Sequence, residues 1–358
     1  MTAIWQPGTP RSIRRVLFAG LGGVGQRHLR NVRALLGEEV RVDAYRVRRE
    51  SWVLDDQLRV VPGAELEQRY ALEVYDDLER ALAQAPDVVF VTNPSSLHVE
   101  VALRAARANA DVFIEKPLSH SLEAVADLER ELSRRGLCSY VGYQLRNHPG
   151  FRRLRETLTD ASLGPVLSVR AEVGEYLPGF HPYEDYRRMY AARSNLGGGV
   201  TLSQIHEIDC LVALFGLPKR GFALGGKVSS LEVDVDDLCS GLLEFEYRGR
   251  RLIAELHQDF FQRPTSRHFS VVGERGRAEW SLSERYFRRW DAQGELQDQV
   301  SYAEFPRNQM FIDELSEFFE CVRTRRPSPL DVAEGGKSLR VALGLLESQR
   351  TFRGVSWS

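Results

Sequence analysis

The stretch that decides the fold is Val16-Leu17-Phe18-Ala19-Gly20-Leu21-Gly22-Gly23-Val24-Gly25, near the start of the chain. A short apolar run is followed at once by glycines in the pattern G-x-G-x-x-G, and a helical pattern over residues 26–36 comes next. Glycine is needed there because the backbone must turn tightly, approach a diphosphate closely and let the helix pack on the strand. The helix N-terminus also attracts an anion. The position of the motif between a first strand and a first helix predicts a dinucleotide-binding turn, with a glycine-rich turn without ligand as the alternative. The expected contacts are Gly20, Gly22, Gly23, Val24 and Gly25.

The first part of the chain alternates short β-prone runs with helical runs. The predicted strands cover residues 16–19, 40–45, 88–92 and 112–114, and the predicted helices cover residues 26–36, 97–108 and 122–134. Strands that alternate with helices are typical of a parallel sheet built from βαβ units. Residues 1–143 are therefore expected to form a Rossmann NAD(P)-binding domain.

The pattern changes after Pro149. Residues 166–176 alternate apolar and polar side chains, as a half-buried strand does, and similar runs recur at 222–231, 238–247, 251–260 and 269–282. Turn-like pieces such as residues 247–249 and 273–276 join these runs. Helical patterns over 308–324 and 331–350 close the chain. The predicted fold class is α/β plus α+β, with a mostly antiparallel open β-sheet flanked by helices in the C-terminal domain. We expect residues 144–330 to form a substrate and oligomerisation domain, and residues 331–358 to form a helix and tail packing back on the other domains.

Composition excludes several classes of protein. The chain has 358 residues, 43% hydrophobic and 27% charged, which suits two globular domains. A formal net charge of −2 offers no argument for nucleic acid or a membrane as a partner. No apolar run resembles a signal peptide or a membrane span, so a cytoplasmic location is expected. The four cysteines are scattered without Cys-x-x-Cys spacing, so we predict neither a disulfide framework nor a metal site.

The end of the second predicted strand bears on the choice of cofactor. An acidic residue there would bind the ribose 2′-hydroxyl of NAD, whereas arginine accommodates the 2′-phosphate of NADP. Asp43 lies inside the strand, too early for that contact, and the strand runs out into basic residues. NADP(H) is therefore favoured, with NAD(H) as the alternative cofactor and a solvated basic loop as the alternative interpretation. The predicted phosphate contacts are Arg46, Arg48 and Arg49.

Four further motifs make the chain resemble a known family. They are Thr92-Asn93-Pro94-Ser95-Ser96-Leu97-His98, Glu115-Lys116-Pro117, Gly197-Gly198-Gly199 and His206-Glu207-Ile208-Asp209. In this order and spacing they resemble the Gfo/Idh/MocA family, which joins a Rossmann domain to an antiparallel-sheet domain. The resemblance implies hydride transfer between a nicotinamide and a carbinol carbon of a sugar, cyclitol or nucleotide sugar. It adds Asn93, Pro94, His98, Glu115, Lys116 and Gln144 to the expected cofactor contacts.

Lys116 is the residue that the resemblance implies as the central catalytic group. A lysine at the end of a buried strand is desolvated, which lowers its pKa from about 10.4 toward the range useful for acid/base catalysis. The resemblance implies His206 as the second catalytic residue, with a satisfied core histidine as the alternative. The aspartate that many members carry three or four residues before this histidine is absent, because Leu202 and Ser203 stand there. This absence favours Lys116 as the main acid/base group.

Other polar and aromatic residues are candidates for substrate contacts. Ser203, His206 and Asp209 are spaced to share one face of a helix after the glycine run. The segment from Glu175 to Arg187 is rich in rings and charges, which suit a sugar and equally suit a subunit contact. The expected substrate contacts are Lys116, Gln144, Tyr176, Tyr186, Arg187, Ser203 and His206.

Two other functions compete with a dehydrogenase or ketoreductase. One is glycoside cleavage through transient oxidation by a tightly held nicotinamide. The other is a non-enzymatic dinucleotide-binding regulator, which the absent aspartate suggests and the retention of Lys116 and His206 disfavours. Because one face of an open sheet is left uncovered, a homodimer or homotetramer through the C-terminal sheet is also expected.

Overall fold

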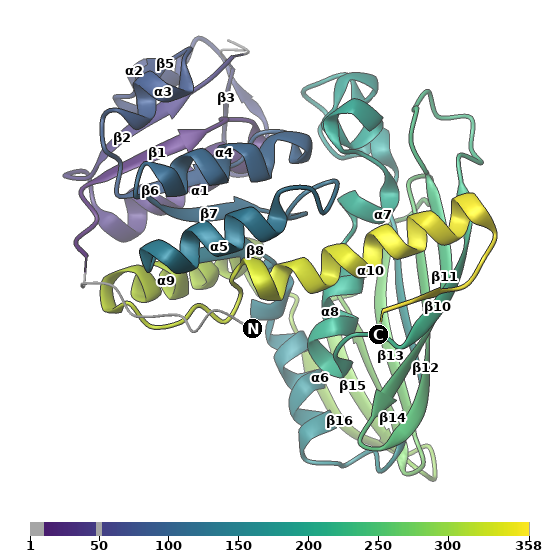
Figure 1. The fold of residues 1–358 in the computed structure, drawn as a ribbon. Coiled ribbons are helices and arrows are strands. Elements are labelled where there is room, and N and C mark those ends of the chain that lie inside the picture. The colour runs from purple at the N-terminus through teal and green to yellow at the C-terminus, as the bar shows by residue number, and fades with distance from the viewer. Residues whose placement is uncertain (1–10, 48–51, 358) are drawn as a thin grey trace. The chain divides into compact units, whose positions relative to one another are not determined.

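The computed structural model describes residues 11–47 and 52–357, and the chain forms two compact units. Of the described residues, the first unit holds those within Met1–Tyr143, His181–Glu184 and Phe311–Gly336, and the second holds those within Gln144–Phe180, Asp185–Met310 and Lys337–Ser358. Most of the first unit is purple to blue in Figure 1, and most of the second is teal to green. Within the described ranges, no helix combines the length and the apolar character of a membrane span.

The first unit is built on a six-stranded parallel sheet in the order β5-β2-β1-β6-β7-β8. Counted along the chain within this sheet, the order is 3-2-1-4-5-6, which is that of dinucleotide-binding Rossmann domains. The predicted parallel sheet is therefore confirmed. Its strands are β1 (Arg15–Ala19), β2 (Arg41–Tyr45), β5 (Glu73–Tyr75), β6 (Val88–Val91), β7 (Asp111–Glu115) and β8 (Ser139–Gly142).

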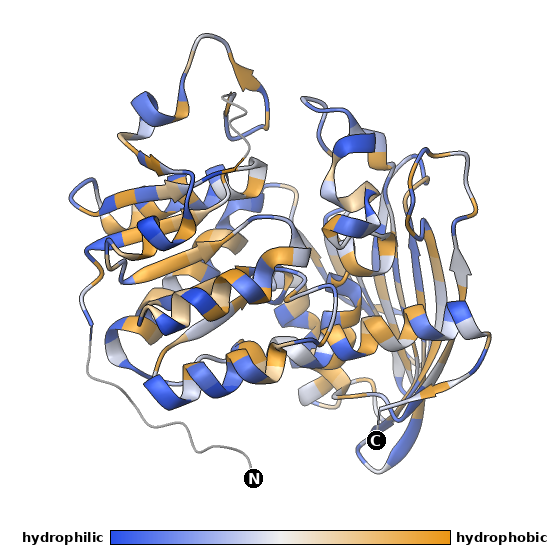
Figure 2. Ribbon diagram, turned by 45° about the horizontal axis from the view of Figure 1, so that its top comes forward, coloured by the Kyte–Doolittle hydropathy of each residue, from blue (hydrophilic) through white to orange (hydrophobic). Residues whose placement is uncertain are grey.

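The central strands are buried on both faces, and orange predominates along them in Figure 2. Phe90 stacks on Phe18 and Phe113, with ring centroids 4.7 and 5.1 Å away, and all three side chains are fully buried. The helices and the short hairpin of this unit are α1 (Gly23–Leu36), α2 (Leu66–Tyr70), α3 (Leu78–Leu82), α4 (His98–Arg107), α5 (Val125–Arg135), the latter part of α9 (Arg307–Thr324), β3 (Val53–Leu54) and β4 (Val60–Val61).

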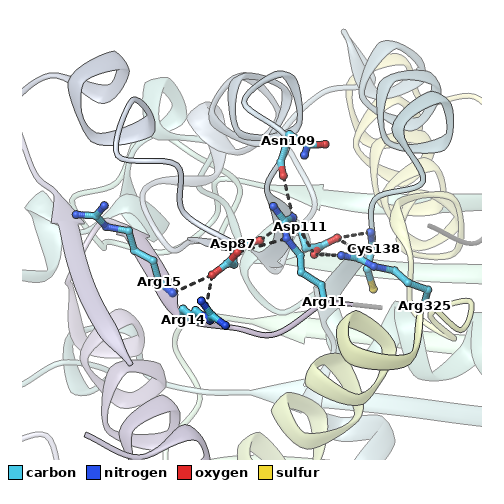
Figure 3. A network of polar contacts seen from close by, with 8 residues as sticks. All are labelled: Arg11, Arg14, Arg15, Asp87, Asn109, Asp111, Cys138 and Arg325. Carbon is cyan, nitrogen blue, oxygen red and sulfur yellow. Dashed lines mark hydrogen bonds and ion pairs between the residues drawn. The ribbon is translucent and has the colours of Figure 1, made fainter. Parts of the chain in front are cut away.

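A polar network fastens the amino ends of these strands (Figure 3). The Asp87 carboxylate accepts hydrogen bonds from the backbone N–H groups of Arg14 and Arg15 at 2.8 and 3.0 Å. The Asp111 carboxylate, fully buried, pairs with both terminal nitrogens of Arg325 at 2.6 and 3.0 Å. This network ties β1, β7 and the residues after α9 together at one sheet edge, and the glycine turn lies at the opposite, carboxyl edge.

The second unit carries a nine-stranded sheet in the order β16-β15-β14-β13-β9-β12-β11-β10-β17. Neighbouring strands run antiparallel except for the β9 and β12 pair, so the predicted mostly antiparallel sheet is confirmed. Its strands are β9 (Val166–Gly174), β10 (Arg220–Gly226), β11 (Leu238–Tyr247), β12 (Arg250–Asp259), β13 (Ser266–Gly273), β14 (Gly276–Ser281), β15 (Tyr286–Asp291), β16 (Leu296–Ser301) and β17 (Val355–Ser356). Its helices are α6 (Pro149–Thr159), α7 (Val200–Ser203), α8 (His206–Phe215) and most of α10 (Val332–Thr351).

Two predictions for this unit are wrong. The strand expected over residues 222–231 ends at Gly226, because the Asp237 carboxylate binds the N–H groups of Val228 and Ser229 and holds a turn there. The single helix expected after the glycine run is broken between α7 and α8. The break is stabilised by the Gln258 side chain, which donates to the Gln204 carbonyl at 2.6 Å.

Candidate active site

The glycine turn between β1 and α1 uses each glycine of the motif differently. Gly20 has a φ of +102°, and a Cβ there would lie 2.9 Å from the backbone nitrogen of Asn93. A Cβ on Gly25 would lie 2.7 Å from the Gly20 carbonyl oxygen, so glycine lets the helix pack on the turn. A Cβ on Gly22 would meet nothing within 4 Å. Gly22 therefore borders the open space that a diphosphate needs.

The turn presents hydrogen-bond donors to that space. Gly22 caps α1 without a side-chain oxygen, and the first helical turn has no acidic residue. The first N–H groups of a helix have no partner inside the helix and attract anions. The Thr92 hydroxyl donates to the Gly20 carbonyl at 2.6 Å, which fixes the turn against the end of β6. The residues present thus fit the diphosphate of a dinucleotide.

The arginine expected to meet a 2′-phosphate is already paired. Arg46 follows β2, is 6% exposed, and its Nη1 lies 3.0 Å from Glu67 Oε1 on α2. Asp43 is held within β2 by Arg15 at 2.6 Å, away from the strand end. The other two predicted phosphate contacts, Arg48 and Arg49, lie outside the described residues. Glu67 was missed by the sequence analysis, because no local pattern shows which helix reaches Arg46.

Lys116 stands directly after β7, and its backbone N–H donates to Glu115 Oε2 at 3.1 Å. Its side chain is half-buried, so its desolvation is less complete than the sequence suggests. The other carboxylate oxygen of Glu115 lies 2.6 Å from Nε2 of the fully buried His28. Burial disfavours the charged form of Glu115, but the hydrogen bond and charge of His28, with those of Lys116, hold the pKa of Glu115 below its ordinary value. The Glu115 and His28 pair thus anchors the backbone at Lys116.

His98 braces the same segment from the start of α4. One ring nitrogen contacts the Pro117 carbonyl oxygen and the other contacts the Asn93 carbonyl oxygen, each at 2.8 Å. Burial lowers the pKa of His98, while the two carbonyl contacts act in the opposite direction. Asn93 and its neighbour Pro94 lie at the end of β6, beside Gly20. His98 therefore supports the two loops that the sequence assigns to the cofactor.

A second buried acid lies beside the Glu115 and His28 pair. Glu314 on α9 is 0% exposed, and neither carboxylate oxygen has a hydrogen-bond partner among the described residues. Ligand-type atoms of His28, Glu115 and Glu314 lie within 4.8 Å of one another, the spacing that a metal ion requires. However, the 2.6 Å between His28 Nε2 and Glu115 Oε1 is a hydrogen-bond distance, whereas two ligands of one tetrahedral zinc lie roughly 3.3 Å apart. Burial, reinforced by the charge of Glu115, raises the pKa of Glu314 well above its ordinary value. The geometry favours a proton on Glu314.

In the second unit, His206 is the first residue of α8 and is 4% exposed. The two acidic residues that follow it in α8, Glu207 and Asp209, form ion pairs with arginines. Glu207 pairs with Arg267 at 2.5 and 2.8 Å, and Asp209 pairs with Arg146 at 2.7 and 2.8 Å. Neither acid can take over from the absent aspartate without giving up a buried ion pair, which is costly.

The end of β12 gathers two of the predicted substrate segments. The Asp259 carbonyl oxygen accepts from the Gln204 side chain and from the Glu175 backbone N–H, both at 3.1 Å. Gln204 directly follows Ser203, which is buried at the end of α7, and Glu175 directly precedes Tyr176. The structure therefore brings the Tyr176 and Ser203 segments together at one strand end.

The remaining predicted substrate residues are distributed more widely. Gln144 is 7% exposed and opens the 3-10 turn Gln144–Asn147. The Tyr186 hydroxyl accepts from the Glu232 N–H at 3.2 Å, and the exposed Arg187 pairs with Asp185 and Glu232 at 2.9 and 3.1 Å. Arg187 is thus engaged in a surface ion-pair network, and its contact with a substrate stays a prediction.

With this geometry in view, comparison with known proteins identifies the class. Residues 14–143 match the "Oxidoreductase family, NAD-binding Rossmann fold", and residues 151–279 match the "GFO/IDH/MocA C-terminal domain". The chain belongs to the Gfo/Idh/MocA family of oxidoreductases, and the predicted membership is confirmed.

Individual relatives are distant. The chain is 25% identical to myo-inositol 2-dehydrogenase of Thermotoga maritima, over 95% of this chain and 98% of that protein. It is 28% identical to 1,5-anhydro-D-fructose reductase of Ensifer adhaerens over 53% of this chain, and it spans about half (55%) of that protein's length. The solved levoglucosan dehydrogenase in complex with NADH superposes with a TM-score of 0.79 at 17% identity, over 96% of this chain and 98% of that one. At this identity the structural match shows the shared fold.

The different surroundings of Gly22 and Gly25 predict different effects of an added methyl group. Gly22→Ala is expected to leave folding intact and to weaken NAD(P)H binding at least tenfold, because the Cβ enters open space beside the turn. Gly25→Ala is expected to lower the free energy of unfolding by about 2 kcal/mol or more, because its Cβ meets backbone. Fluorescence titration with NADPH and urea unfolding check the two expectations. A Gly22→Ala protein that binds as tightly as wild type would contradict the assignment of this space.

The buried acid predicts a pH dependence of stability. Because the folded-state pKa of Glu314 is raised, the folded protein holds a proton that the unfolded chain releases, and wild-type stability falls as the pH rises above the ordinary glutamate value. Glu314→Gln stays neutral, so it gains stability relative to wild type between pH 5 and pH 8, by at most about 1.4 kcal/mol per pH unit. Urea unfolding at these pH values measures the gain, with Glu320→Gln on the exposed face of α9 as the control. Parallel pH profiles for wild type and Glu314→Gln would show that Glu314 is ionised in the fold.

Proposed function

We propose that the protein is an NAD(P)-dependent dehydrogenase or ketoreductase that transfers hydride between a nicotinamide and a carbinol carbon of a sugar, cyclitol or nucleotide sugar. The observation that carries the proposal is the glycine turn, which has open space at Gly22 and lies in the same unit as the anchored Glu115 and Lys116 segment. The names of the relatives, an inositol dehydrogenase and an anhydrofructose reductase, support the substrate class. A bound nicotinamide supplies the hydride donor or acceptor.

Lys116 is the proposed acid/base group. Its ammonium can donate a charge-assisted hydrogen bond to the reacting oxygen and exchange a proton with it. The Glu115 carboxylate accepts a hydrogen bond from the backbone N–H group of Lys116, and His28 in turn binds Glu115. The backbone from which the lysine side chain extends is therefore held in place. Oxidation of an alcohol requires removal of the hydroxyl proton, and reduction requires its return. Lys116 serves both directions.

His206 is the proposed second contact to the substrate hydroxyl. It lies in the second unit with Ser203, Gln144 and Tyr176, which are proposed to bind the substrate along with Tyr186 and Arg187. Because Leu202 and Ser203 stand where many relatives carry an aspartate, Lys116 carries the main proton transfer in this proposal.

The family fold binds NAD, and NADP(H) is proposed as the preferred form. The support is that a buried arginine, Arg46, stands where an NAD-specific domain carries an acid, while Asp43 is held inside β2. A 2′-phosphate can bind Arg46 only if the guanidinium leaves Glu67 or contacts both groups at once. The preference therefore depends on both members of the pair.

A homodimer or homotetramer through the C-terminal sheet is part of the proposal. On the sheet face opposite its helices, Phe222 and Leu242 are cross-strand partners, with Leu224 beside them. These side chains are 36, 53 and 50% exposed, respectively. Exposed apolar patches of this kind on a sheet mark association surfaces.

The direct test of the function is a turnover assay with Lys116→Ala. Wild type is incubated with NADP+ or NAD+ and a panel of sugars, cyclitols and nucleotide sugars, and reduced cofactor is followed by absorbance. Lys116→Ala is expected to lower kcat by about 10²- to 10⁴-fold while cofactor affinity stays within a few-fold of wild type. Undiminished turnover in the variant would refute the acid/base assignment. A product formed without accumulation of reduced cofactor would instead indicate redox-neutral chemistry.

The Arg46 and Glu67 pair predicts opposite shifts in cofactor preference. Arg46→Ala is expected to weaken NADPH binding by about tenfold or more and to leave NADH binding nearly unchanged, because only NADPH carries the 2′-phosphate. Glu67→Gln removes the competing carboxylate and is expected to tighten NADPH binding severalfold. Calorimetric titration of both variants with both cofactors checks this. Equal effects on NADH and NADPH would contradict the proposed preference.

The sheet surface is tested by the mass of the protein in solution. Leu242→Glu places a charge at the centre of the exposed patch and is expected to shift the species seen by light scattering from an oligomer to a single chain. Leu296→Glu, which changes a 49% exposed leucine on edge strand β16, is the matched control and should keep the wild-type mass. A wild-type protein that is already monomeric would refute the proposed oligomer.

A further inference from the structure

A short aromatic segment covers the glycine turn. His181–Glu184 folds with the first unit although the chain on both sides of it belongs to the second. The Tyr183 ring stacks on His181, with centroids 5.1 Å apart at 15°, and lies against Trp52 with centroids 4.8 Å apart. The segment is closed by His181 Nδ1, which lies 2.7 Å from Glu184 Oε1. Tyr183 is thus held between two rings.

The hydroxyl group of Tyr183 is aimed at the start of α1. A Cβ built on Gly23 would lie only 2.5 Å from Tyr183 Oη, so the hydroxyl rests on the backbone of the turn. The neighbouring Gly22 faces open space. Tyr183 Oη is buried and has no hydrogen-bond partner among the described residues. A buried hydroxyl left without a partner costs about 1–3 kcal/mol, so its position calls for an acceptor that arrives from outside the chain.

The surroundings select an anionic acceptor. The first N–H groups of α1 point out of the helix beside the hydroxyl, and the first helical turn carries no acidic residue. Burial raises the pKa of Tyr183, with the charge of Glu184 adding to it and that of Arg27 opposing it, so the phenol keeps its proton and serves as a donor. An anion over Gly22 and Gly23 would therefore meet helix N–H donors and the phenol.

We propose that Tyr183 is a clamp on the cofactor diphosphate, donating its hydroxyl hydrogen to a diphosphate oxygen that lies over Gly22 and Gly23. The proposal rests on the proposed dinucleotide binding and extends it to a residue outside the family motifs. The stacked ring of His181 and the tilted ring of Trp52 hold the phenol in place before the cofactor arrives, so little side-chain entropy is lost on binding. The competing outcome is a plug, in which Tyr183 occupies the diphosphate position and must leave.

The test is Tyr183→Phe, which removes one oxygen and keeps the stacked ring. Calorimetry measures the binding of NADPH, of ADP-ribose, which keeps the diphosphate, and of AMP, which lacks it. The clamp predicts about tenfold weaker binding of NADPH and ADP-ribose, unchanged binding of AMP, and faster release of NADPH in stopped-flow fluorescence. Tyr70→Phe is the matched control, because its hydroxyl is also buried without a partner among the described residues but lies on α2.

The possible outcomes distinguish a failure of the proposed clamp from a failure of the proposed dinucleotide binding. If wild type binds NADPH and Tyr183→Phe binds it equally well or more tightly, the clamp is wrong, and tighter binding identifies the plug. If all three ligands weaken equally, the hydroxyl acts on the fold and the clamp is also wrong; thermal unfolding of the variant confirms that reading. If wild type binds no dinucleotide, the proposed function fails first and the clamp fails with it.

Discussion

The close approach of backbone to backbone around Gly20 and Gly25 is the constraint on which the rest of the first unit depends. A side chain on Gly25 would strike the Gly20 carbonyl, and one on Gly20 would strike the end of β6. Because neither carries one, α1 starts immediately after the turn and its N-terminus opens beside Gly22. The same turn sets His28 on α1, which reaches Glu115 and through it the backbone of Lys116. The proposed cofactor contact and the proposed proton transfer by Lys116 thus depend on the same backbone constraint.

Most of the fold could be predicted from the sequence, and the failures have physical reasons. Runs such as Val88–Val91 are apolar throughout because a parallel strand is buried on both faces, and their alternation with helical patterns predicted the parallel sheet of a Rossmann domain. β15 and β16 were not predicted. Tyr286–Asp291 mixes aromatic residues with Arg288 and Arg289, and Leu296–Ser301 is largely polar, since both strands lie near a sheet edge. Their place is set by pairing with neighbours that no local pattern identifies.

The residues of the candidate site likewise include some that the sequence alone indicates and others that it does not. Gly22, Glu115 and Lys116 could be found because each belongs to a contiguous motif whose chemistry is local. Glu67, Tyr183 and Glu314 could not, because each reaches its partner from a distant segment without a motif of its own. Tyr183 lies in a stretch that the sequence analysis assigned to the substrate or to a subunit contact. Packing on Gly23 gives it a different partner.

A crystal structure of the protein with NADP+ bound would test the proposed cofactor site most directly. We expect the diphosphate over Gly22 and Gly23 within hydrogen-bond distance of Tyr183 Oη, the adenosine ribose toward Arg46, and the nicotinamide beside Lys116. A dinucleotide bound away from the glycine turn, or a nicotinamide distant from Lys116, would contradict the proposed site.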